Sequence, residues 1–132
     1  MIFDGDQKRL QTENIKHAFK MTERSDVNTF DVWIKERITY LPGDKWPERW
    51  LVQESLNNLV GLSLLIGIDE GELRDICNKG LSAGKHNEFY EIGCLVGLTT
   101  EDTLNRFCIH VAQNNKQSFA DVILAIESRL EK

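Results

Sequence analysis

The side chains best placed to act on another molecule are carboxylates concentrated in one stretch of the chain. Residues 56–104 contain eight acids and three bases, so this segment holds a net charge of −5, equal to that of the whole chain. Such charge is usually a solvated face, but it can also present a phosphate-like field to a basic protein. The second interpretation predicts a partner-binding surface made of Asp69, Glu70, Glu72, Asp75, Glu88 and Glu91.

Tryptophans supply a second candidate contact surface. Trp46 and Trp50 lie four residues apart at the start of a predicted helix, with Arg49 between them. Trp and Arg are the residue types that contribute most to protein interfaces, although core packing explains the same spacing. If these three side chains are exposed, we expect them to bind a protein partner.

The basic residues favour a different partner, a nucleic acid. The three bases of residues 56–104 cannot offset the eight acids there, so this segment should be repelled by the phosphate backbone of DNA. An acidic helix can still recognise cytosine if residues elsewhere in the protein bind the phosphates. Residues 8–24 contain five bases and could provide those contacts. The candidate phosphate contacts in this alternative are Arg74, Lys79, Lys85, Lys8 and Arg9.

Catalytic and metal-binding patterns are missing from the sequence. It has no HExxH, no Gly-rich phosphate loop and no Ser in a nucleophile elbow. His86, Glu88, Glu91 and Cys94 are close in sequence, but their spacing does not match a metal site. We therefore expect a non-enzymatic protein without metal or cofactor.

The chain has the length and composition of one intracellular domain. Its 132 residues suffice for a hydrophobic core, and no apolar run approaches a membrane span. Cys77, Cys94 and Cys108 are odd in number and lack CxxC pairing, which favours free thiols in a reducing compartment. A cytoplasmic location is the expectation.

Apolar residues recur at spacings of three and four, which predicts a single compact all-α domain over residues 1–132. We expect a helical extension over residues 1–45, a core over 47–113, and a helix over 118–132 that packs or dimerises through its apolar stripe. The predicted helices cover Gln7 to Lys20, Thr29 to Tyr40, Pro47 to Ile66, Asp69 to Gly80, Asn87 to Gly97, a segment from Thr99, and a segment from Ser118.

The segment from Leu62 to Ile76 reads as a helix, a tight turn at Gly67 and a second helix that begins after Asp69. This order resembles the phage-repressor-like (Cro-type) helix-turn-helix family, and Ile92 to Thr99 repeats the pattern that such proteins use after their recognition helix. The resemblance implies a helix-turn-helix core. Recognition helices of the family usually present Gln, Ser, Arg or Lys, whereas acids stand at these positions here.

The acidic charge therefore outweighs the DNA-binding function that the resemblance implies. We expect a regulatory protein that binds a macromolecular partner, for example to inhibit a nucleic-acid-binding protein. The alternative is a sequence-specific DNA-binding regulator.

Overall fold

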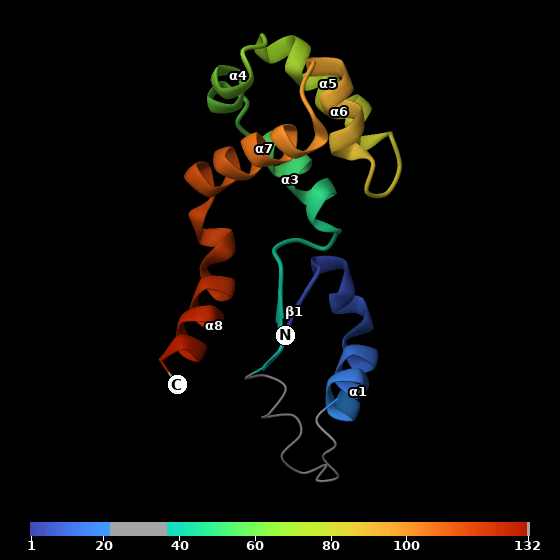
Figure 1. The fold of residues 1–132 in the computed structure, drawn as a ribbon, viewed down its shortest axis with the longest axis vertical. Coiled ribbons are helices and arrows are strands. Elements are labelled where there is room, and N and C mark those ends of the chain that lie inside the picture. Colours follow the sequence, from blue (N-terminus) through green and yellow to red (C-terminus); the bar gives the residue numbers. More distant parts are fainter. Residues whose placement is uncertain (22–36, 132) are drawn as a thin grey trace. The chain divides into compact units, whose positions relative to one another are not determined.

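The fold is all-α, as predicted. The computed structural model describes residues 1–21 and 37–131, and seven α-helices occupy most of these residues (Figure 1). In the same residues, the only sheet has two strands of two residues each. None of the described helices is long and apolar enough to cross a membrane.

The chain divides into two compact units. The first combines Met1–Lys45 with Ser118–Lys132, and the second is Trp46–Gln117. The predicted single-domain organisation of residues 1–132 stays a prediction.

The first unit is held by its N-terminus. Strand β1 (Ile2–Phe3) pairs in parallel with β2 (Thr39–Tyr40). The 3-10 helix η1 (Gly5–Leu10) follows β1 and leads into α1 (Gln11–Met21), while α8 (Ala120–Leu130) packs against β2. Gly5 is required in η1, because a Cβ there would lie 2.2 Å from the carbonyl oxygen of Gly43.

Three predicted helix boundaries in this unit are wrong. The helix expected over Thr29 to Tyr40 lies mostly outside the described residues, but its end is the strand β2, since Thr and Tyr suit a strand that pairs with the N-terminus. The first helix begins as η1 rather than as an α-helix. The last helix is preceded by the 3-10 helix η2 (Lys116–Phe119), and its N-cap is Phe119 rather than Ser118.

The second unit contains five α-helices that share one core. They are α3 (Pro47–Ser55), α4 (Val60–Ile66), α5 (Glu70–Leu81), α6 (Glu88–Val96) and α7 (Thr100–Asn114). Helix α5 packs on α6 and α6 on α7, while α3 and α4 also pack on α7 (Figure 1). Phe107 of α7 is completely buried and meets Phe89 of α6 edge to face, with ring centroids 5.0 Å apart.

The long helix predicted from Pro47 to Ile66 is wrong, because it is broken between α3 and α4. The Asn58 amide donates to the Ser55 carbonyl at 3.2 Å, which forms a turn after α3. The Asn58 carbonyl in turn accepts a hydrogen bond from Nε2 of His110 at 2.6 Å. A residue 52 positions away in the sequence thus stabilises a break in the helix that the regular spacing of apolar residues does not predict.

The turns between α4 and α5 and between α6 and α7 have the same geometry, 30 residues apart in sequence. Gly67 (φ 81°, ψ 30°) and Gly97 (φ 77°, ψ 28°) end their helices, as predicted, and both have a left-handed backbone. Asp69 and Thr99 then cap the following helices by accepting backbone N–H groups, which confirms both predicted caps. The second unit therefore contains the same helix–turn–helix connection twice.

The hydrogen bonds of the two turns also correspond. The carbonyl of Ser63 accepts from the amides of Gly67 and Ile68, and the carbonyl of Gly93 accepts from those of Gly97 and Leu98. Because this connection occurs twice, its local geometry alone does not single out a DNA-reading pair of helices.

The prediction that the helix from Asp69 ends at Gly80 is wrong. Helix α5 continues to Leu81, and Gly80 is buried inside it. A Cβ at Gly80 would lie 2.6 Å from Cγ1 of Ile92, so glycine is needed there for close packing of α5 on α6. The left-handed glycine of this region is Gly84.

Candidate functional site

Helix α5 has one apolar face and one charged face. Leu73, Ile76 and Cys77 are buried. Because they are three and four residues apart, they lie on one face of the helix and fix its orientation. The exposed side chains on the other face include three of the six residues of the predicted acidic surface. They are Glu70, Glu72, Arg74, Asp75, Asn78 and Lys79.

The middle of this exposed face has no basic residue. Helical spacing places Gly71, Asp75 and Asn78 along its centre, opposite the buried side chains. Arg74 and Lys79 lie on the two flanks, and each has a carboxylate four residues earlier, the spacing that favours interaction between opposite charges. The acids therefore offset the two bases that a phosphate backbone would need.

The N-terminus of α5 is also satisfied by the protein's own carboxylates. Asp69 Oδ2 accepts the Gly71 N–H at 3.0 Å, and Glu70 and Glu72 lie in the first turn. A helix N-terminus attracts phosphate because its free N–H groups carry partial positive charge. At α5, acidic residues already compensate that charge.

Helix α4, which precedes the turn, carries no charged residue. Leu64 and Val60 are 82% and 56% exposed, respectively, and lie four residues apart on one face. Ser63, a polar residue of this helix, donates its hydroxyl hydrogen to the Ile68 carbonyl within the turn. The outer surface of α4 is therefore apolar and that of α5 is acidic, so neither offers much to bind phosphate.

Glu88 does not belong to the acidic surface, contrary to the sequence prediction. Its side chain is completely buried, and Oε1 accepts the indole N–H of Trp46 at 2.6 Å. Its other oxygen, Oε2, has no hydrogen-bond partner among the residues that the structure describes. Glu88 is the first residue of α6, so its backbone position directs the carboxylate inward, which acidity alone cannot predict.

The predicted tryptophan surface is half-buried. Arg49 and Lys85 lie over the ring of Trp46, with the guanidinium carbon and ammonium nitrogen 5.6 and 5.0 Å from its centroid. Arg49 also donates to the Leu81 carbonyl at 3.0 Å. Trp50 is half-buried too. These contacts hold the loop before α6 against α3, which accords with the core-packing explanation of the spacing.

His86 is part of the same loop. It adopts a left-handed backbone (φ 67°), which is strained for a residue other than glycine, and its Nδ1 lies 3.1 Å from Oε1 of Glu48. This contact joins the loop to the first turn of α3. His86 therefore contributes to the position of the loop.

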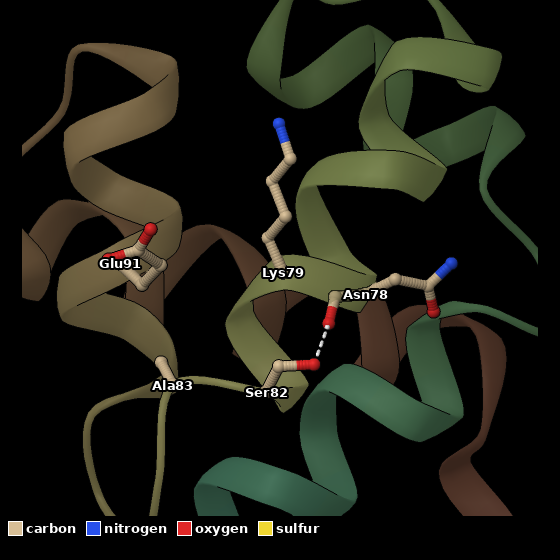
Figure 2. Close-up of a pocket in the computed structure, with 5 residues that line it drawn as sticks. All are labelled: Asn78, Lys79, Ser82, Ala83 and Glu91. Carbon is tan, nitrogen blue, oxygen red and sulfur yellow. Dashed lines mark hydrogen bonds between the residues drawn. The ribbon is translucent and has the colours of Figure 1, made fainter.

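An open groove of about 540 Å³ lies between the end of α5 and α6 (Figure 2). Its lining includes Lys79 and Glu91, which extend from the two helices, and the Ser82 hydroxyl, which donates to the Asn78 carbonyl at 3.1 Å. Lys79 is the candidate DNA contact that lines this groove, beside the predicted partner contact Glu91. The groove thus brings together one residue from each sequence hypothesis.

A second pocket, with a volume of about 260 Å³, was not predicted from the sequence. It lies at the carboxyl ends of α3 and α7, and polar side chains dominate its lining. The sequence marks its two halves with a pair of Asn-Asn dipeptides, one near the end of each helix, but does not indicate that they meet. The lining residues are Glu54, Asn57, Asn58, His110, Val111, Asn114 and Asn115.

All five candidate DNA contacts are on the surface. Arg74, Lys79 and Lys85 are exposed in the second unit, and Lys8 and Arg9 are exposed in η1 of the first unit. The structure thus places the five candidates on two separate units.

The apolar stripe of the predicted dimerisation helix consists of Phe119, Val122, Ile123, Ile126 and Leu130. In α8 and at its N-cap, Val122 is buried, Phe119 is half-buried, and the other three are exposed. Dimerisation stays a prediction.

The three cysteines are free thiols, as predicted, and differ in environment. Burial raises the pKa of Cys77 to about 12, although Arg74 opposes this shift, and partial burial raises the pKa of Cys108. Cys94 is exposed.

These environments predict an order of reaction with a thiol reagent. At pH 8 only about one in ten thousand Cys77 side chains is a thiolate, the reactive form. We expect iodoacetamide to modify Cys94 first, Cys108 more slowly, and Cys77 only after unfolding, as followed by peptide mass spectrometry. Fast modification of Cys77 in the folded protein would contradict its burial.

Comparison of the chain with protein-family models, curated proteins and solved structures found no match.

Proposed function

We propose that this chain is a non-enzymatic regulatory protein that binds a basic, nucleic-acid-binding protein through the exposed face of α5. The observation that carries the proposal is the absence of a base along the centre of that face, where Asp75 lies between Gly71 and Asn78. A basic partner gains Coulomb attraction there, whereas DNA meets repulsion.

The neighbouring surface supports a protein partner. Interfaces between proteins combine an apolar centre with a polar rim. Leu64 and Val60 of α4 provide exposed apolar area, and the acids of α5 provide the charge that would select a basic partner. The groove beside Lys79 and Glu91 adds a concave feature at the other end of α5.

The first test asks whether the wild-type protein binds DNA. We expect no saturable change in fluorescence anisotropy of a labelled random duplex, even at about 50 mM salt, where phosphate contacts are strongest. Salt-sensitive binding that is lost in Arg74→Ala/Lys79→Ala would contradict the proposal and establish the DNA-binding alternative.

The second test asks whether the acids of α5 select a protein. Partners are captured from the host with wild-type protein and with Glu70→Gln/Glu72→Gln/Asp75→Asn. We expect a basic protein that wild type retains, the variant loses, and added duplex DNA releases. The matched control is Glu101→Gln/Asp102→Asn, which removes exposed acids from the first turn of α7. Equal recovery with both variants and wild type would exclude the α5 face.

The DNA-binding alternative is favoured by one observation. The Lys79 side chain extends from α5 beside an open groove, where a flexible ammonium could meet a phosphate (Figure 2). In that function Arg74 and Lys85 would add phosphate contacts.

A further inference from the structure

We propose that the pocket at the carboxyl ends of α3 and α7 binds an organic cation, either a free amine or the side chain of a lysine or arginine. This site is separate from the exposed face of α5 and does not depend on the function proposed for that face.

The size of the pocket suits a small group. Its volume of about 260 Å³ is below the roughly 300–1,000 Å³ that is usual for drug-sized ligands. The lining contains amide and carboxylate oxygens from Glu54 and four asparagines, which can accept from the N–H groups of an ammonium or guanidinium; Oδ1 of Asn114 already accepts from the Asn58 side-chain amide at 3.2 Å. Glu54 is the only lining residue with a formal charge apart from the titratable ring of His110.

The helix ends make the pocket electrically negative. A helix C-terminus carries partial negative charge and is usually compensated by Lys, Arg or His in the last turn. Neither α3 nor α7 has a basic residue in its last turn, and α3 has the carboxylate of Glu54 there instead. Two helix ends without a basic residue in the last turn and one carboxylate thus border one cavity, where a bound cation would interact favourably with all three.

The hydrogen bonds within the pocket leave this charge in place. The carboxylate Oε1 of Glu54 accepts from the side-chain amide of Asn115 at 2.7 Å, a neutral donor. Nε2 of His110 donates to the Asn58 carbonyl, which leaves Nδ1 as the acceptor for the Asn114 amide at 3.2 Å. An acid in the last turn of α3 departs from the usual rule of helix stability, and such departures are expected at functional sites.

The test uses n-butylammonium and methylguanidinium as probes of the two cation types, and n-butanol as a neutral probe of similar shape. We expect saturable chemical-shift changes in the side-chain amides of Asn58, Asn114 and Asn115 and in the His110 ring with both cations. In Glu54→Gln we expect the affinity for the cations to fall by about tenfold or more. The matched control Glu101→Gln, an exposed acid at the other end of α7, should bind like wild type.

Glu54→Gln keeps the oxygen that accepts from Asn115, so the fold should persist, as circular dichroism can check. The proposal fails if no probe gives saturable shifts, if Glu54→Gln binds the cations as well as wild type, or if n-butanol binds equally. A second variant, Asn57→Lys, adds an ammonium from the protein itself. It should raise the melting temperature and compete with the probes.

Two further ligands distinguish the sources of the cation. Putrescine represents a free amine, and Nα-acetyl-lysine methylamide represents a lysine within a protein. At least tenfold tighter binding of putrescine indicates a free amine, whereas similar affinities indicate that a lysine side chain of another protein fits. Since no protein partner is used, failure here leaves the proposal for α5 unaffected.

Discussion

Replacing Glu70, Glu72 and Asp75 by lysine is expected to create DNA binding that the wild-type protein lacks. The three changes turn three negative charges on the exposed face of α5 into three positive ones, beside the existing Arg74 and Lys79. Non-specific DNA affinity comes from such charges and typically gives a Kd of about 10⁻⁴ to 10⁻⁶ M at physiological salt. We expect a gain of at least about hundredfold at low salt, measured by anisotropy with a labelled duplex.

The control for this gain reverses acids outside α5. In Glu101→Lys/Asp102→Lys, positive charge appears in the first turn of α7, in the same unit but after the second turn. If this variant binds DNA as well as the α5 variant, net charge rather than the α5 face is responsible. A steep fall of affinity with salt in the α5 variant alone would support the face-specific explanation.

The second large effect is expected on stability. Phe107→Ala should reduce the free energy of unfolding of the second unit by about 3–5 kcal/mol, because it empties the centre of the core and removes the edge-to-face contact with Phe89. Domains are usually stable by only about 5–15 kcal/mol. Denaturant unfolding followed by circular dichroism measures this change.

Ile109→Ala provides the comparison on the same helix. Ile109 is 48% exposed, so its truncation should cost less than about 1 kcal/mol. A similar loss in both variants would mean that Phe107 is not at the centre of the core.

Local signals in the sequence were sufficient to predict the turns of the second unit. Gly67 and Gly97 adopt the left-handed conformation that glycine permits, and Asp69 and Thr99 accept the backbone N–H groups that capping residues accept. These features depend on neighbours within a few residues.

Features that depend on distant contacts could not be predicted in this way. The break before α4 is stabilised by His110, and the role of Gly80 is decided by Ile92 on another helix. Neither partner is evident from the spacing of apolar residues, which continues through both positions.

The candidate surfaces likewise divide into one that follows from local sequence and others that depend on distant contacts. The acidic face of α5 follows from helical spacing around buried Leu73, Ile76 and Cys77, so its orientation could be inferred from sequence. The burial of Glu88 depends on Trp46, 42 residues away. The pocket beside Glu54 needs two helix ends to meet, and no local pattern reveals their meeting.

Because the turns after α4 and α6 have the same backbone geometry, the α6 turn can replace the α4 turn, but the reverse replacement should fail. A graft of Gly93–Thr99 in place of Ser63–Asp69 would forfeit the hydroxyl bond from Ser63 to Ile68 and keep the backbone path. The reverse graft would bring a serine Cβ to 3.0 Å from Oγ1 of Thr103 and 2.9 Å from the carbonyl oxygen of residue 98. Chimeric chains should therefore tolerate the first exchange and misfold or loosen with the second.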